Sequence, residues 1–195
     1  TIEVERSLRV LDGAVAVFDA VAGVEPQTET VWRQANKYGV PRMCFVNKMD
    51  RLGADFFAAL ASIKDRLQCN AAVIQLPIGA EGNYKGVIDL IEMNALVWQD
   101  EELGAKWDIV PIPDELHDQA DEYRAELLDV ISAHDDNILE KYVGEEEITA
   151  DDLRKALREA TIANQVVPRP NRGAQKNKGG APQHVAGVTD KTAPL

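Results

Sequence analysis

The sequence predicts an α/β fold, because short apolar runs alternate with segments that have the apolar spacing of helices. The three apolar runs are residues 14–18, 43–46 and 71–76. Two segments with helical spacing separate them, with apolar residues at Val31, Ala35 and Tyr38 and then at Phe56, Leu60, Ile63 and Leu67. Continuous apolar strands joined by helices of about a dozen residues indicate a parallel sheet covered on both faces.

The ends of these elements follow from turn and capping residues. Residues 2–11 have mostly helical spacing that stops at Asp12-Gly13, where the first strand begins. The next helix is expected to start at about Thr28, after Pro26, and to stop at Gly39. The second strand then runs directly into a polar segment that begins at Asn47.

Beyond residue 76 the pattern changes, which predicts a second, inserted α+β unit. Residues 84–90 and 95–98 read as extended segments, and residues 116–131 and 153–160 as helices with acidic outer faces. Residues 149–152 resemble a capping box ahead of the last helix. We therefore divide the chain at 1–76, 77–164 and 165–195, and expect the third part to be a poorly ordered basic tail.

Composition narrows the classes of function. The 195 residues are 45% hydrophobic and 28% charged, which is typical of a soluble globular protein. A net charge of -12 argues against a broad surface for DNA or RNA, since phosphates need clustered Lys and Arg. No apolar run approaches the length of about 18 residues that a membrane helix needs. Cys44 and Cys69 fit no metal-ligand spacing, so we read them as reduced thiols of a cytosol-like compartment.

The chemistry of the chain is concentrated in residues 47–50, Asn-Lys-Met-Asp, directly after the second strand. Ligands of parallel α/β sheets gather at the carboxyl ends of strands. The carboxylate of Asp50 can accept two parallel hydrogen bonds from the ring N–H and the amino group of guanine, a donor pair that adenine lacks. Asn47 can donate to the other edge of the base, and the stem of Lys48 can lie along the purine face. The alternative is that Asn47 and Asp50 serve only as turn formers.

The flanks of this motif resemble elongation factor G. The resemblance rests on residues 1–13, 23–27, 30–34 and 47–55, and on residues 77–79, 85–90 and 95–98, which resemble an insertion peculiar to that family's GTPase domain. It extends from residue 1 to about residue 168. It implies a partial P-loop-GTPase-type sheet with an inserted subdomain, and a chain that is an internal piece of a longer protein, in keeping with a start at Thr1 rather than Met.

The resemblance also implies roles. Asn47, Lys48 and Asp50, with the backbone of Gly173 and Ala174, would bind the guanine of GTP or GDP, and Mg²⁺ would assist in the intact protein. The parent would be a GTPase that drives ribosomal translocation in the cytoplasm, or in a mitochondrial matrix, with the ribosome as partner and the acidic residues 77–164 docking the ribosomal stalk protein.

The residues that would hold phosphate are missing from this sequence. It contains no G-x-x-x-x-G-K-[ST] loop, so we expect the chain alone to be inactive as a GTPase. The tail also departs from the family, because Pro170 and two arginines, Arg169 and Arg172, stand where a strand is expected. The alternative reading is a non-catalytic, ribosome-associated module that docks proteins.

Overall fold

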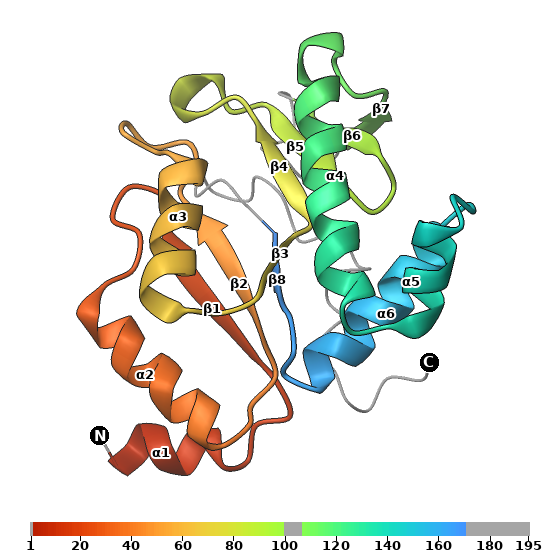
Figure 1. Ribbon diagram of the computed structural model, residues 1–195. Coiled ribbons are helices and arrows are strands. Elements are labelled where there is room, and N and C mark those ends of the chain that lie inside the picture. Colours follow the sequence, from red (N-terminus) through yellow and green to blue (C-terminus); the bar gives the residue numbers. More distant parts are fainter. Residues whose placement is uncertain (1, 100–106, 171–195) are drawn as a thin grey trace.

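The computed structural model describes residues 2–99 and 107–170 (Figure 1). Its parallel strands confirm the predicted α/β class. Strand β1 (Ala14–Asp19) pairs in parallel with β2 (Arg42–Asn47), and β3 (Ala71–Val73) pairs in parallel with β8 (Val167–Arg169). The N–H of Val46 donates to the carbonyl of Pro170 over 3.2 Å, so β8 lies between β2 and β3. Their spatial order is therefore β1, β2, β8, β3.

Helix α1 (Ile2–Leu8) precedes β1, α2 (Pro26–Lys37) connects β1 to β2, and α3 (Phe56–Leu67) connects β2 to β3. Proline at the first position of α2 is favourable, because its missing N–H would have no partner there. At the start of α3 the side chain of Asp55 accepts from the N–H of Ala58 over 2.9 Å. The apolar faces of α2 and α3 bury Trp32 and Ile63 against the sheet.

The predicted third strand is wrong at its end. The chain leaves the parallel sheet after Val73, and residues 75–78 begin a separate antiparallel sheet. Residues 71–76 are all buried, so their apolar run carried no sign of the division. The new sheet has the order β4 (Gln75–Ile78), β5 (Gly86–Asp89), β6 (Asn94–Trp98) and β7 (Trp107–Val110), with the short 3-10 helix η1 (Glu81–Asn83) between β4 and β5.

Helices α4 (His117–Ser132), α5 (Asp136–Val143) and α6 (Ala150–Ile162) follow a 3-10 turn, η3 (Asp114–Leu116). The predicted capping box is confirmed, since Thr149 accepts from the N–H of Asp152 over 3.2 Å and the carboxylate of Asp152 accepts in return. Figure 1 shows these helices on one side of the parallel strands, with α2 and α3 on the other.

The two predicted units share one hydrophobic core. A single cluster of buried residues extends from Phe18 through Ile88 and Leu127 to Val167. Helices α3 and α4 also meet directly, with the rings of Phe57 and Tyr123 5.9 Å apart. The predicted boundary at residue 76 falls inside β4, and both sheets pack into the same core. The division into domains remains a prediction.

The start of the predicted tail also needs correction. Residues 167–169 form a buried strand in the sheet, although the sequence alone predicts a tail from residue 165. Arg169 is fully buried, and its guanidinium donates to the carbonyl of Leu60 over 3.4 Å and to the sulfur of Cys69 over 3.0 Å. Pro170 lacks an N–H, but its carbonyl still accepts from β2. Partners from distant segments therefore override the local sequence signals.

Two valines of β1 are unusually exposed to solvent. Val15 and Val17 are 54% and 60% exposed, whereas strands of parallel sheets are normally covered on both faces.

Both cysteines are free thiols, and burial raises the pKa of Cys44 to about 12. Within residues 2–99 and 107–170, none of the helices has the length and apolar character needed to span a bilayer.

Candidate functional site

The candidate site lies at the carboxyl ends of β1 and β2. Asp19 ends β1 and Asn47 ends β2, and the two are paired in register. The carbonyl of Asn47 accepts from the N–H of Ala20 over 2.9 Å, so the turn after β1 is joined to the end of β2. The sheet therefore places the polar segment 47–50 at the edge where parallel α/β proteins bind ligands.

The loop that follows β2 is tightly folded. Lys48 has φ +66°, and the side chain of Asn47 accepts from the N–H of Lys48 over 2.9 Å. The N–H of Arg51 donates to the carbonyl of Lys48 over 3.1 Å. Met49 is fully buried and anchors the loop, whereas Asn47, Lys48 and Asp50 are half-buried. Met49 thus points into the core, while the three polar side chains of the motif stay partly accessible to solvent.

Lys48 is held by an ion pair with Asp19. Its ammonium Nζ contacts Oδ2 of Asp19, while Oδ1 accepts from the N–H of Val21 over 2.8 Å and of Ala22 over 3.4 Å. The hydrogen bond from Lys48 is the main reason why the pKa of Asp19 lies below its ordinary value, with the two backbone donors adding to it against the opposing effect of burial. The aspartate therefore stays ionised and fixes the end of the lysine.

A residue of η1, the 3-10 helix between β4 and β5, also contacts this loop. The N–H of Glu81 donates to the carbonyl of Met49 over 2.8 Å, and Oε1 of Glu81 accepts from the N–H of Gly53 over 2.7 Å. These two contacts lie on either side of Asp50 along the chain. The loop is thus supported both by β1 and by the segment between β4 and β5.

A pocket of about 200 Å³ lies beside the site and is lined in part by Asn47 and Lys48. Its other walls come from β1 and from the start of α2, namely Val17, Phe18, Asp19, Gly23, Glu25 and Thr28. Asp50 does not line it. The pocket is therefore a neighbour of the motif and not a complete site for a base.

The loop carries donor and acceptor groups of the kinds that can pair with guanine. Asp50 provides a carboxylate, Asn47 an amide and Lys48 an aliphatic stem, all on one short loop at the strand ends. Asn47 also acts as a turn former, since its side-chain oxygen is engaged by the next N–H. The two readings of the motif are therefore compatible for Asn47. Gly173 and Ala174, the other predicted base contacts, lie outside the described residues.

Two residues of the site were not anticipated from the sequence. Asp19 carries a usable signal, since it is a polar residue at the end of an apolar run and the strand pairing places it level with Asn47. Glu81 carries none, because its link to Met49 and Gly53 depends on how a second sheet packs against the loop.

Comparison with known proteins agrees with this geometry. Residues 1–178 match the family model of the elongation factor Tu GTP binding domain. The fold is similar to a crystal structure of a protein from Thermus thermophilus, with a TM-score of 0.76 and 30% sequence identity over 88% of this chain. The match covers 25% of the Thermus protein, so this chain spans about a quarter of that protein's length. Because the family model covers residues 1–178, which is most of the chain, the chain belongs to the family of the elongation factor Tu GTP binding domain.

Proposed function

We propose that this chain is the guanine-reading part of an elongation factor of the G type, a GTPase that promotes ribosomal translocation. The observation that carries the proposal is the placement of Asn47, Lys48 and Asp50 on one loop at the carboxyl ends of two parallel strands. In this role Asp50 accepts from the ring N–H and amino group of guanine, and Lys48, oriented by Asp19, covers one face of the base.

Hydrolysis requires groups that this sequence does not contain. We place the phosphate-binding loop and the Mg²⁺ ligands elsewhere in a longer polypeptide, because no G-x-x-x-x-G-K-[ST] occurs among the 195 residues. The exposed Val15 and Val17 of β1 support this view, since strands of parallel sheets are normally covered on both faces. Mg²⁺ would neutralise the charge of the phosphates at the phosphate-binding loop, whereas the residues of this chain select the base.

The test of base recognition compares nucleotides in the complete polypeptide, meaning this chain joined to a phosphate-binding loop. We expect GDP to displace a fluorescent GDP analogue at least a hundredfold better than ADP, and Asp50→Ala to remove most of that preference. Arg51→Ala, at an exposed neighbour in the same loop, is the matched control and should change little. Equal competition by ADP and GDP would rule out the proposed role of the motif.

A second candidate function is docking of a protein, for which α5 is the relevant surface. Its side chains Leu139 and Val143 are 42% and 74% exposed, and the acidic residues 145–147 follow directly. An apolar patch beside acidic groups favours a protein partner over RNA. The ribosomal stalk protein is the partner that we propose, in the cytoplasm or a mitochondrial matrix.

Calorimetry with purified stalk protein tests the docking proposal. Val143→Lys should weaken binding at least fivefold, because it places a charge in the apolar patch. Val10→Lys is a control at a valine that is 79% exposed on a different part of the surface. Binding to bare ribosomal RNA that exceeds binding to the stalk protein would exclude this function.

A further inference from the structure

The segment between β4 and β5 has an unusual backbone where it meets the loop after β2. Glu81 has φ +54°, a left-handed conformation that is uncommon for a residue with a side chain. Gly79, two residues earlier, has φ +78°, and a Cβ there would lie 2.1 Å from the carbonyl oxygen of Asn83. Backbone strain of this kind persists only where surrounding contacts hold it in place, and it is often found at functional positions.

The contacts that hold Glu81 are made to one loop. Its N–H donates to the carbonyl of Met49 over 2.8 Å, and its carboxylate accepts from the N–H of Gly53 over 2.7 Å. Gly53 is itself left-handed, with φ +82°. Glu81 therefore fixes the loop at two points, one residue before Asp50 and three residues after it. A carboxylate that accepts from a backbone N–H forms a charge-assisted bond, which is stronger than a neutral one.

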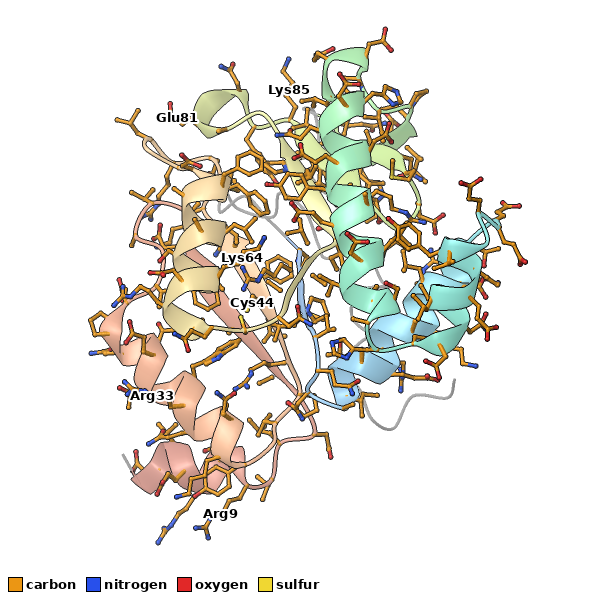
Figure 2. The ribbon with its side chains drawn as sticks, in the orientation of Figure 1. Arg9, Arg33, Cys44, Lys64, Glu81 and Lys85 are labelled. Atoms are coloured by element: carbon orange, nitrogen blue, oxygen red, sulfur yellow. The ribbon has the colours of Figure 1, made fainter. Side chains whose placement is uncertain are left out.

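We propose that Glu81 is a positioning residue for guanine recognition, holding the loop 48–53 in the geometry in which Asp50 meets the base. This inference rests on the proposed function of Asp50. Glu81 does not itself line the pocket beside Asn47 and Lys48, so it acts through the loop. Figure 2 shows Glu81 near the loop that precedes α3, whereas the neighbouring Lys85 points away from the molecule.

A positioning role makes the antiparallel sheet part of the specificity of the site. Glu81 belongs to η1, which connects β4 to β5, and the N–H of Lys85 donates to the carbonyl of Ile78 over 2.9 Å to close this connection. A small displacement of a recognition group costs far more than the loss of one contact, because hydrogen bonds depend steeply on distance and angle. Glu81 is thus expected to affect base selectivity from outside the base-binding motif.

Three substitutions at Glu81 separate the tether from the strain. Glu81→Ala removes the acceptor for Gly53 and keeps a side chain at the left-handed position. Glu81→Gly also removes the acceptor but relieves the backbone strain. Glu81→Gln retains an oxygen that can accept from Gly53. Lys85→Ala, at an exposed residue of the same segment, is the matched control.

The first measurement is amide hydrogen exchange at Gly53 without nucleotide. We expect exchange about tenfold or more faster in Glu81→Ala and Glu81→Gly, and near wild-type rates in Glu81→Gln and Lys85→Ala. We also expect Glu81→Gly to melt at a higher temperature than Glu81→Ala. Unchanged exchange at Gly53 in both the alanine and glycine variants would overturn the tether.

The second measurement is the preference for GDP over ADP in the complete polypeptide. Glu81→Ala and Glu81→Gly should lower it about fivefold to fiftyfold, with Glu81→Gln restoring most of it. Faster exchange at Gly53 with an unchanged preference would mean that Glu81 is only structural, and would overturn the proposal. If the wild-type polypeptide showed no preference for GDP, both the proposed function and this role would fail, while the exchange rates would still report on the tether.

Discussion

Replacing Asp19 with asparagine should destabilise the chain by removing the ion pair with Lys48. The amide oxygen of the new side chain would still accept from the N–H groups of Val21 and Ala22, so the substitution isolates the charge. The side chains of Asp19 and Lys48 are 23% and 32% exposed, which lies between a surface pair and a buried one. Exposed pairs contribute about 0–1 kcal/mol, and truncation of buried pairs costs about 3–5 kcal/mol, so we expect a loss of about 1.5 kcal/mol.

The dependence of this loss on pH identifies its cause. Lys48 lowers the folded-state pKa of Asp19 below the unfolded value of about 3.9. The stabilisation is therefore complete above the unfolded pKa and disappears as the pH falls through the folded pKa. Urea denaturation of both proteins at pH 6 should show the full difference in the free energy of unfolding, and the difference should shrink as the pH is lowered below about 4.

Two controls make this test decisive. Asp65→Asn removes an exposed aspartate from α3 and should change the free energy of unfolding by less than about 0.5 kcal/mol. The double-mutant cycle formed by Asp19→Asn, Lys48→Met and the variant with both changes measures the coupling between the two side chains. A loss in Asp19→Asn that is equally large at pH 6 and at the lowest pH where the chain is folded would refute the ion-pair explanation.

Three further outcomes are expected. In the complete polypeptide, Asp50→Asn should shift the binding preference from GDP toward xanthosine diphosphate by roughly tenfold to several-hundredfold, because one hydrogen-bond position is inverted. Competition binding measures this preference. A folded variant that still prefers GDP would exclude Asp50 as the guanine reader. Thr149→Ala should cost about 1 kcal/mol in urea denaturation through loss of the helix cap, and an unchanged midpoint would contradict it. Arg169→Met should raise the free energy of unfolding by about 1–3 kcal/mol, because the fully buried guanidinium has only neutral acceptors among its described hydrogen bonds. A clear loss of stability would show that these hydrogen bonds outweigh the cost of removing the guanidinium from water.

The strands and helices near the motif could be predicted because local signals agree there. Strand β2 ends at Asn47, where buried residues give way to polar ones. Helix α3 begins after Asp55, whose side chain caps it. The split at Val73 could not be found this way, since both sides of it are buried and differ only in which sheet they join. Neither could β8, where proline and arginine argue against a strand and distant partners decide otherwise.

The residues of the candidate site also divide into those that the sequence predicts and those that it does not. Asn47, Lys48 and Asp50 could be identified because they are contiguous and follow a strand. The ion pair of Lys48 with Asp19 required the register of β1 against β2, and the contact of Glu81 with Gly53 required the packing of a second sheet. Asp19 is marked only by its position at the end of an apolar run, and Glu81 has no such mark, so a reading of the motif alone misses both residues.

The position of β8 has a consequence for the order in which this chain folds. Strand β8 pairs with β3 across about a hundred intervening residues, and it lies between β2 and β3 in the sheet. Closing such a long loop carries an entropic cost that must be met before the pairing is formed. During synthesis the first strands therefore emerge with the centre of their sheet missing. The parallel sheet can be completed only after residue 169 has left the ribosome, so we expect this region to need protection from aggregation until then.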